Sequence, residues 1–469
     1  MSYLYNYKLT TNAEFLRVDL LDEIRQFSGK FSDIDIEVCL TYDENMHTDV
    51  TVGDILSHYT AALPDGDEIE IKRQVKRFVK HSLYMTLSEI SGIKLPWGSL
   101  TGIRPTKLAY AYIAKGGQVD NVSDYMQSTF TVSSHRANLL QRIIKAQRSA
   151  LSQMPDSAVN LYVHIPFCDG RCNYCSFPSV DISKKGSNDL LSRYVDALIS
   201  EIAEMKKFIA ARNESIFSVY VGGGTPSVLG ENDLERLLNA IAADNCEFTF
   251  EAGRADSFSC EKTAILKAGG VTRICVNPQT LNDDTLARIG RRHTASDFYK
   301  AYFTAKEAGF DINTDIIAGL EGETPSDFAH TADSIAELQP ENVTVHTLSR
   351  KRASLLADTE LSCPDIERMM DYAFMRFSDY EPYYLYRQKN MVGNLENVGF
   401  CKKGKECVNN ITVMEEMVPV YACGAGSISK RVGKCISRFA SPKDVGLYID
   451  ELKERTDKKL MFLSGERVE

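Results

Sequence analysis

The fold of this chain is decided by the stretch Leu161-Tyr162-Val163-His164-Ile165-Pro166-Phe167-Cys168-Asp169-Gly170-Arg171-Cys172-Asn173-Tyr174-Cys175. An apolar, strand-like run leads into three cysteines with the spacing C-x3-C-x2-C. Iron–sulfur clusters are held by cysteine thiolates, and a [4Fe–4S] cluster normally takes four of them. A loop that offers three leaves one iron open, and an open position distinguishes a catalytic metal site from a closed structural one. The sequence therefore predicts that Cys168, Cys172 and Cys175 hold a reactive [4Fe–4S] cluster.

Two other uses of these cysteines follow from the residues alone. Free cysteine is among the most buried residue types, so three packed structural thiols are one alternative. Three cysteines within eight residues, flanked by Asp, Gly, Arg and Asn, do not resemble a core stripe, however. Zinc is the stronger alternative, but zinc sites usually pair two knuckles, and no second knuckle follows at the usual distance. The cluster is favoured over zinc, and zinc over structural thiols.

The composition is that of an ordinary globular protein. The 469 residues are enough for two or three domains, and no apolar run approaches the roughly 18 residues that span a membrane. The first residues lack the basic and apolar regions of a signal peptide. Twelve cysteines in such a chain predict a reducing, cytoplasmic location, where thiols serve metals or catalysis. The formal net charge of −10 argues against nucleic acid as the main partner.

The segment from about 158 to 350 alternates strand-like and helical patterns. Short apolar, β-rich runs occur at 161–165, 218–221, 247–251, 272–276, 311–318 and 342–347. Helical periodicity fills most of the gaps, for example at 194–211, 233–243 and 297–308. Such alternation indicates a parallel sheet covered by helices. Six units predict an α/β fold, a partial (β/α)6 TIM-type barrel without full eight-fold closure, with its chemistry at the carboxyl ends of the strands.

Two further regions flank the predicted barrel. We predict an N-terminal α+β accessory domain at 1–153, the barrel at 154–355 and a small C-terminal lobe at 356–469. The N-terminal domain combines a strand at 35–38 with helices at 71–90, 106–114 and 134–151. The C-terminal lobe begins with a helix at 365–379 and is rich in Tyr, Gly and Cys.

Polar and glycine residues stand where several of these strands end. The run Gly222–Gly224 lets a backbone approach a ligand closely, although a tight turn between strand and helix uses the same residues. Asp315 lies inside an otherwise apolar strand, and a buried carboxylate needs partners. Tyr162 and His164 share one face of the first strand by period-two alternation. A lone strand histidine is more often a satisfied core residue than a functional one.

The cysteine loop carries a resemblance to a known family. The C-x3-C-x2-C spacing with Tyr174 before the last cysteine resembles the signature of radical S-adenosylmethionine (SAM) enzymes. The longer string Tyr-Val-His-Ile-Pro-Phe-Cys resembles the oxygen-independent coproporphyrinogen III dehydrogenase group, with its HemN, HemW and HemZ branches. The resemblance is strong over about 158–350, and the segment at 390–397 is similar to the HemZ branch in particular.

The resemblance implies a radical SAM barrel and a role for each strand-end residue. The three cysteines would bind the [4Fe–4S] cluster, and one or two SAM molecules would bind beside it. The implied cofactor-binding residues are Tyr174, Gly222, Gly223, Gly224, Thr225, Glu251, Gln279, Arg291 and Asp315. Tyr162 and His164 are the implied catalytic residues, because in the family they border the cluster and the substrate cavity.

The implied activity is an oxidative decarboxylation in haem biosynthesis. A flavodoxin- or ferredoxin-type donor reduces the cluster, and SAM is cleaved to methionine and a 5′-deoxyadenosyl radical. The radical takes hydrogen from a propionate of coproporphyrinogen III, and loss of carbon dioxide and one electron leaves a vinyl group, as in protoporphyrinogen IX. The cofactor carries the hard chemistry, while the protein binds, orients and excludes water and oxygen.

Two departures from the family pattern leave the substrate open. HemN-type enzymes carry another cysteine two residues after the third ligand, whereas this chain has Phe177 and in that respect resembles HemW. No histidine follows His346, so the C-terminal His-Asn-x2-Tyr-Trp segment of HemN and HemW has no histidine here. A haem-binding chaperone of HemW type is therefore the alternative function. An RNA-modifying radical SAM enzyme is a more distant one, disfavoured by the acidic balance.

Four more cysteines fall within 35 residues, at positions 401, 407, 423 and 435. Loops rich in Gly and charge are usually exposed, so Cys401 and Cys407, spaced C-x5-C in such a loop, are predicted to be exposed. Scattered free thiols are slightly favoured. The pair also allows the hypothesis of a second metal, haem or redox centre near the substrate.

Overall fold

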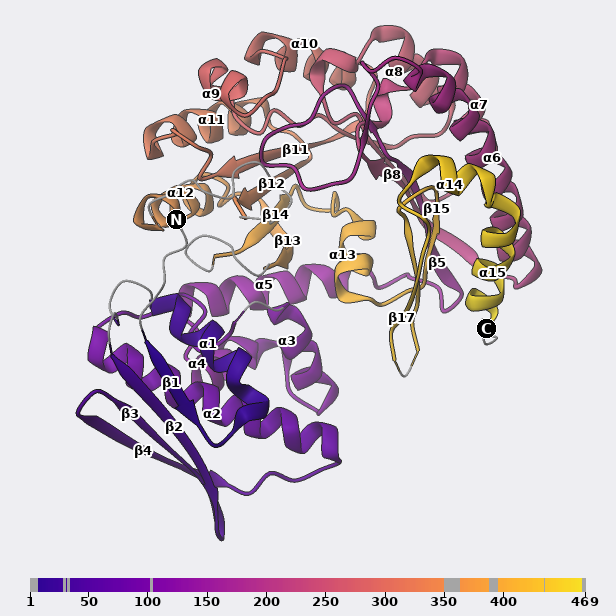
Figure 1. Ribbon diagram of the computed structural model, residues 1–469. Helices are drawn as coiled ribbons and strands as arrows, with labels where there is room; N and C mark the ends of the chain where they lie inside the picture. The colour runs from indigo at the N-terminus through magenta and orange to yellow at the C-terminus, as the bar shows by residue number, and fades with distance from the viewer. Residues whose placement is uncertain are drawn as a thin grey trace. The chain divides into compact units, whose positions relative to one another are not determined.

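A computed structural model describes residues 7–27, 31, 34–101, 104–349, 363–387, 395–433 and 435–465 (Figure 1). It divides into two compact units, one of Met1–Ile144 with Arg387–Glu396 and one of Lys145–Tyr386 with Asn397–Glu469. The three-domain division made from the sequence stays a prediction. Most of the HemZ-like segment at 390–397 lies outside the described residues.

The first unit contains a four-stranded sheet of order β1-β2-β3-β4. Its elements are β1 (Lys8–Thr11), α1 (Arg17–Ile24), β2 (Asp35–Tyr42), β3 (Asn45–Val52), β4 (Ile55–Ala62), α2 (Glu68–Ser91), α3 (Pro105–Ala114), α4 (Val122–Phe130) and the start of α5 (Ser134–Ala150). The sequence predicted the strand at 35–38 and the helices α2, α3 and α5, but not β1, β3, β4, α1 or α4. In β3, buried Met46, Val50 and Val52 alternate with His and Asp, and this alternation is a strand signal hidden by polar residues.

The second unit contains an eleven-stranded sheet of order β13-β14-β12-β11-β10-β9-β8-β5-β15-β16-β17. Six neighbouring parallel strands are those predicted from the sequence: β5 (Ala158–Ile165), β8 (Ser215–Gly223), β9 (Glu247–Glu251), β10 (Arg273–Cys275), β11 (Asp311–Ala318) and β12 (Asn342–Thr347). The sheet does not close on itself in the described part of the chain. The partial barrel is therefore confirmed.

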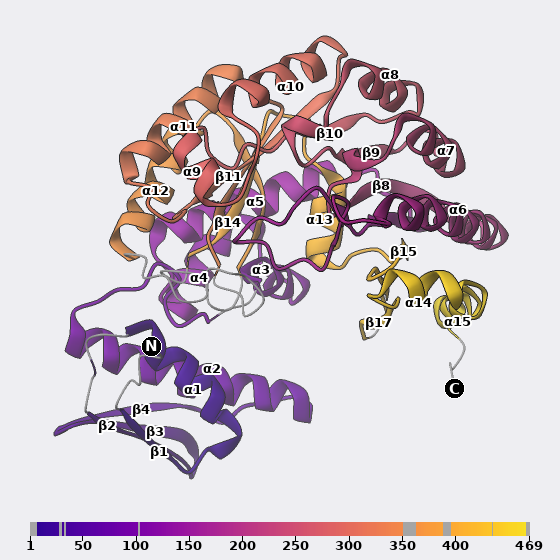
Figure 2. The same cartoon turned by 45° about the horizontal axis from the view of Figure 1, so that its top comes forward.

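Helices cover the outer face of this sheet as an arc (Figure 2). They are α6 (Ser187–Ala211), α7 (Glu231–Ile241), α8 (Cys260–Ala268), α9 (Asp283–Arg288), α10 (Ala295–Glu307), α11 (Pro325–Leu338) and α12 (Cys363–Arg376). Thr294 and Thr324 begin α10 and α11 with capping boxes, in which side chain and backbone satisfy each other's free groups. Within the described ranges, no helix combines the length and apolar character needed to cross a membrane.

The C-terminal residues extend the same sheet at both edges. On one side, β14 (Asn397–Cys401) pairs antiparallel with β12 and with β13 (Glu381–Tyr386). On the other, β15 (Val420–Cys423) pairs parallel with β5 and leads into β16 (Ile428–Arg431), β17 (Ser437–Ala440), α14 (Val445–Asp450) and α15 (Leu452–Ser464). Between them lies α13 (Val408–Glu415). The strands on both edges are thus part of the barrel wall.

The amino ends of the strands are closed by α13. The Glu247 carboxylate accepts hydrogen bonds from the backbone N–H groups of Val408 and Asn409, each at 3.1 Å. A carboxylate at this position also complements the positive end of the helix dipole. Arg273 lies 3.3 Å from the same carboxylate, so the charge at this end is neutralised by its own neighbours.

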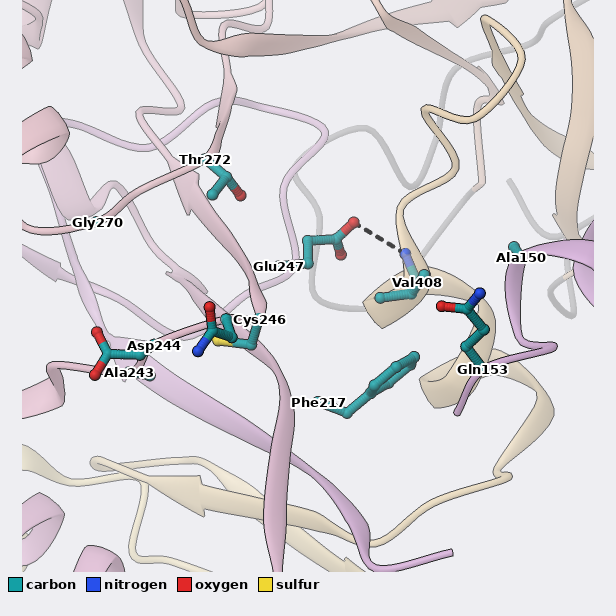
Figure 3. A pocket seen from close by; sticks show the side chains of 11 residues that line it. Ala150, Gln153, Phe217, Ala243, Asp244, Cys246, Glu247, Gly270, Thr272 and Val408 are labelled. Atoms are coloured by element: carbon teal, nitrogen blue, oxygen red, sulfur yellow. Dashed lines mark hydrogen bonds between the residues drawn. The ribbon is translucent and has the colours of Figure 1, made fainter. Parts of the chain in front are cut away.

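A cavity of 650 Å³ opens at the same amino ends. Phe217, Cys246, Glu247 and Val408 line it, together with the Gln153 side chain (Figure 3). Burial, helped by the charges of Glu247 and Asp244, raises the pKa of the Cys246 thiol to about 11. This thiol is therefore protonated and unreactive at neutral pH.

The predicted exposure of the second cysteine pair is wrong. Cys401 and Cys407 are both buried, in a core cluster with Tyr383, Tyr384 and Ile411. Burial raises the pKa of both thiols well above the ordinary value, and Cys407 donates a hydrogen bond to Glu247 at 3.2 Å. The charged loop between them follows a strand and precedes a helix, so its two ends carry their cysteines into the core.

Candidate active site at the carboxyl ends of the strands

The three-cysteine loop follows β5 at the carboxyl end of the barrel. A short parallel ladder of β6 (Phe167–Cys168) and β7 (Val180–Asp181) fixes its start. Arg171 donates to the carbonyl oxygen of Cys175 at 3.1 Å, and the Cys175 amide donates to the Cys172 carbonyl at 3.0 Å. Burial raises the pKa of the Cys175 thiol, and the neighbouring Cys172 and Cys168 add to this.

This donor set fits an iron–sulfur cluster. All three thiols are half-buried and close enough to repel one another as thiolates, and bound iron would relieve that repulsion. Among the described residues, no three His, Cys, Asp or Glu side chains converge as the ligands of one ion do. Thiolates of a cubane each bind a different iron, so a cluster does not need such convergence. Three thiolates leave one iron for another ligand.

Arg291 and Tyr174 hold the cysteine loop against the strand ends. The Arg291 guanidinium donates to the Tyr174 hydroxyl at 2.9 Å and to the carbonyl oxygens of Gly253 and Asn277 at 2.9 and 2.7 Å. Tyr174 packs against a small apolar cluster at the barrel rim. The Nε atom of Arg291 is buried without a hydrogen-bond partner in the described part of the chain. Arg291 therefore orders the loop and keeps one donor for a ligand.

Tyr162 and His164 lie on the same face of β5, as the period-two alternation predicted. The Tyr162 hydroxyl lies 2.9 Å from His164 Nδ1. Burial lowers the pKa of His164 to about 4 and raises that of Tyr162 far above its ordinary value. Both side chains are therefore neutral at neutral pH. Tyr194 donates to the His164 carbonyl oxygen at 2.6 Å and fixes the strand end.

The three glycines at the carboxyl end of β8 leave room for the protein's own groups. A Cβ atom on Gly222 would lie 2.7 Å from a Glu251 oxygen, and one on Gly223 would lie 2.5 Å from the His164 ring. On Gly224 it would lie 2.4 Å from the Phe167 carbonyl oxygen. The turn that follows is also tight, because the Thr225 amide donates to that carbonyl oxygen at 2.7 Å. The run is required to pack the site, whether or not a ligand also approaches it.

Two carboxylates face each other across the strand ends. Glu251 accepts a hydrogen bond of 2.5 Å from the Tyr220 hydroxyl and one of 3.3 Å from the Gly223 amide. Asp315 accepts bonds from the Asn277 and Asn313 side chains at 2.9 and 2.8 Å.

Their electrostatic surroundings differ. Burial raises the pKa of Glu251, and the charge of Asp315 adds to this. Among the described residues neither carboxylate forms an ion pair with Lys or Arg. Half-buried carboxylates without a Lys or Arg partner suit a positively charged ligand.

Gln279 adopts a strained backbone beside Asp315. Its φ is +69° although it is not glycine. Two hydrogen bonds hold it there, from the Gln279 amide to the Asp315 carbonyl at 3.0 Å and from the Ile317 amide to the Gln279 carbonyl at 2.9 Å. Its side-chain oxygen is buried without a hydrogen-bond partner in the described chain. Strain of this kind persists where surrounding structure enforces it, and it clusters at functional sites.

Sequence reasoning missed four polar residues at this end of the barrel. Tyr220, Asn277 and His346 contact the predicted site residues Glu251 and Asp315. The fourth, Tyr386, contacts His346. The signal was present in the strand at 342–347, where Asn, Thr and His alternate with valines. An alternation of polar residues in an otherwise buried strand indicates a polar barrel interior.

The fold and the cysteine loop together define a radical SAM protein. The model of the Radical SAM superfamily matches residues 162–335, a range that holds every predicted site residue. The solved structure of coproporphyrinogen III oxidase (HemN) from Escherichia coli superposes with a TM-score of 0.53 at 22% identity, covering 66% of this chain and 73% of that one. This likeness confirms the fold.

Similarity to curated proteins assigns the chain to a narrower group within this superfamily. A protein of Bacillus subtilis named oxygen-independent coproporphyrinogen-III oxidase-like protein HemZ is 34% identical over 420 residues, 85% of this chain and 83% of the relative. The heme chaperone HemW of Bacillus subtilis is 29% identical over 305 residues, 63% of this chain and 76% of the relative. The chain belongs to the oxygen-independent coproporphyrinogen III oxidase-like group of the radical SAM superfamily. Its cofactors are those predicted, a [4Fe–4S] cluster and SAM.

Proposed function

We propose that this chain is an oxidoreductase that converts coproporphyrinogen III to protoporphyrinogen IX without oxygen. The observation that carries the proposal is its 34% identity, across 85% of the chain, to the oxidase-like protein HemZ. For each propionate, one hydrogen atom passes to the 5′-deoxyadenosyl radical, carbon dioxide leaves, and one electron passes to an external one-electron acceptor, which leaves a vinyl group. A flavodoxin- or ferredoxin-type protein is the proposed electron donor.

The proposed cofactor ligands lie on the cysteine loop and on β9 and β11. Cys168, Cys172 and Cys175 would hold the cluster, which together with SAM supplies a 5′-deoxyadenosyl radical when bound. Glu251 and Asp315 would bind the positively charged SAM molecule, because their carboxylates are half-buried and have no Lys or Arg partner among the described residues.

The remaining predicted residues would shape the site. Gln279 and Arg291 each offer a buried polar atom without a partner in the described chain, and such atoms gain most from a ligand that bonds to them. Neutral Tyr162 and His164 form the wall between the glycine run and the cysteine loop. Their buried, uncharged side chains would keep water from the reacting carbon.

Anaerobic turnover tests the proposal directly. Reconstituted protein is incubated with SAM, a reductant and coproporphyrinogen III, and the products are separated by mass. We expect two successive losses that correspond to carbon dioxide and hydrogen, with one 5′-deoxyadenosine formed per loss. A Cys172→Ala variant, which cannot hold the cluster, is the control. Intact substrate after SAM cleavage by the wild type would contradict the proposal.

A haem chaperone of HemW type is the second candidate function. The 29% identity to HemW supports it, as does Phe177, which stands where HemN-type enzymes carry a cysteine and is 55% exposed here. Titration with haem under the same anaerobic conditions separates the two. Tight haem binding, with coproporphyrinogen III returned unaltered, would favour the chaperone.

A further inference from the structure

His346 lies next to Asp315 in the barrel interior. The two strands that carry them are neighbours, with Ile317 of β11 opposite His346 of β12. His346 Nε2 lies 3.5 Å from an Asp315 carboxylate oxygen. On the other side of the ring, the Tyr386 hydroxyl of β13 lies 3.2 Å from Nδ1. The histidine is therefore held between a phenol and a carboxylate, and its side chain is 24% exposed.

Tyr386 and Asp315 together orient the His346 ring. Burial, with the charge of Asp315 adding to it, raises the pKa of Tyr386 far above its ordinary value, so the hydroxyl keeps its proton. An ionised carboxylate can only accept, so Nε2, which faces Asp315, carries a proton. Nδ1 accepts from the Tyr386 hydroxyl when the ring is neutral and donates to it when the ring is charged. The tautomer of a histidine is set in this way by the bond that its other nitrogen makes.

His346 changes the charge state of Asp315. Burial raises the pKa of the Asp315 carboxyl, but the hydrogen bond and charge of His346, together with bonds from uncharged neighbours, outweigh burial and hold the pKa below its ordinary value. Hydrogen bonds from Asn313 and Thr344 act in the same direction. Asn277 also bonds to the carboxylate but carries no charge. Among the described residues, His346 is the one basic group that contacts Asp315.

We propose that Tyr386 and His346 are positioning residues that keep Asp315 ionised and oriented for the positively charged SAM molecule. The inference rests on the proposed function, because Asp315 is itself a proposed SAM contact. It adds two residues beyond the family motifs and explains how a buried carboxylate stays charged near a second one, Glu251. Titratable groups from four strands face Asp315, and they are Glu251, Cys275, His346, Tyr384 and Tyr386.

The test is SAM affinity as a function of pH, measured by anaerobic calorimetry on reconstituted protein. In His346→Ala, the loss of affinity at acid pH should begin about one pH unit or more above that of the wild type, because an opposite charge moves a carboxyl pKa by about that much. Tyr386→Phe should move it the same way but by less. His346→Gln keeps a hydrogen-bond donor but cannot carry a charge. Its SAM affinity at pH 8 should therefore match the wild type, while its loss of affinity at acid pH should still begin at a higher pH than in the wild type.

Tyr383→Phe is the matched control. Tyr383 is buried on the same strand, and its hydroxyl accepts a bond from Asn410 instead, so the pH profile should match the wild type. A second control uses Asp315→Asn, in which adding His346→Ala should no longer shift the profile. A shift that persists there would show that His346 acts through Glu251, and the inference would be wrong.

Failure of this inference is distinct from failure of the proposed function. A wild-type protein that binds no SAM would overturn the proposed function before any variant is made. If the wild type binds SAM and His346→Ala weakens binding equally at every pH, His346 contributes packing only and this inference alone is overturned. An unchanged affinity in His346→Ala has the same consequence.

Discussion

Two glutamates at opposite ends of β9 lie in opposite electrostatic surroundings. Glu247, at the amino end, is 3.3 Å from Arg273 and accepts two backbone N–H bonds from the start of α13. Glu251, at the carboxyl end, accepts bonds from a hydroxyl and one amide, and its nearest charged neighbour of the same sign is Asp315. At the amino end, Arg273 and the α13 amides neutralise the Glu247 carboxylate. At the carboxyl end, no Lys or Arg of the described residues pairs with Glu251, so its charge is available to a ligand.

This difference indicates that the amino ends of the barrel strands contribute stability and that the carboxyl ends carry the chemistry. In barrels of this type, polar residues at the amino ends of strands serve stability, and those at the carboxyl ends serve chemistry. A cavity by itself does not mark the site, because one of 650 Å³ opens beside Glu247 at the amino ends. Its cysteine, Cys246, has a thiol pKa raised to about 11. Chemistry is indicated by unmatched charge and unpartnered polar atoms more than by volume.

Removing one cysteine at each end should give the largest difference. Cys168→Ala should abolish the oxygen-labile cluster and SAM cleavage, since two thiolates of the loop cannot replace three. Cys246→Ala, at the amino end, removes a half-buried thiol of similar exposure and should leave iron per chain unchanged. Iron and acid-labile sulfide are measured after anaerobic reconstitution. Zinc instead of iron in the wild type would refute the cluster.

Exchanging the two glutamates for glutamine should separate binding from stability. Glu251→Gln should weaken SAM binding about tenfold to hundredfold, the range expected for a bond to a charged group, with little change in the unfolding midpoint. Glu247→Gln leaves Arg273 buried without its partner and should cost about 3 kcal/mol of unfolding free energy. Affinity per folded chain should then be unchanged.

Calorimetry of SAM binding and urea unfolding together check this pair. The proposed difference between the two glutamates would be refuted if both variants lost stability and neither lost SAM affinity, because both carboxylates would then be structural. The difference would also be refuted if Glu247→Gln weakened SAM binding while the protein remained folded.

The sequence predicted the barrel better than it predicted the first unit or the barrel interior. The six parallel strands carry short runs rich in apolar and β-branched residues, and the regular alternation of such runs with helical segments is a strong signal of a parallel sheet. In the first unit, β3 and β4 hold His, Asp and Thr on their open faces, and this weakens the same signal.

The site residues that could be predicted from the sequence also differ from those that could not. The cysteine spacing is local, so one segment was enough to find it. His346 and Tyr386 lie on different strands and meet Asp315 only through pairing of β11, β12, β14 and β13. The predicted exposure of Cys401 and Cys407 was wrong because the loop between them is charged, whereas the two cysteines at its ends are buried. Local composition could not reveal either arrangement.

A third carboxylate at the carboxyl end should respond to pH. Burial raises the pKa of Glu323 to about 7, and one of its oxygens is buried without a hydrogen-bond partner in the described chain. A carboxyl whose pKa is raised by folding destabilises the protein as pH rises from its ordinary value toward 7. Glu323→Gln should therefore be more stable than the wild type by about 2 kcal/mol at pH 8. Unfolding in urea at several pH values measures the difference.

The difference should largely disappear below about pH 3.5, where the wild-type carboxyl is mostly protonated in both the folded and unfolded chains. Thr280 donates to Glu323, and glutamine can accept the same bond. A stability gain equal at all pH values would mean that packing, not ionisation, is responsible. A loss at pH 8 would contradict the raised pKa.

The smallest effect is expected from the cysteine pair at the amino end. Cys401 and Cys407 are buried among tyrosines, and their thiols are protonated because burial raises their pKa. Replacing both by alanine removes two small buried side chains and the bond from Cys407 to Glu247. We expect a loss of about 1–2 kcal/mol in unfolding free energy, with iron per chain, haem affinity and turnover unchanged. A fall in iron content would instead restore the hypothesis of a second centre and would place chemistry at both ends of the barrel.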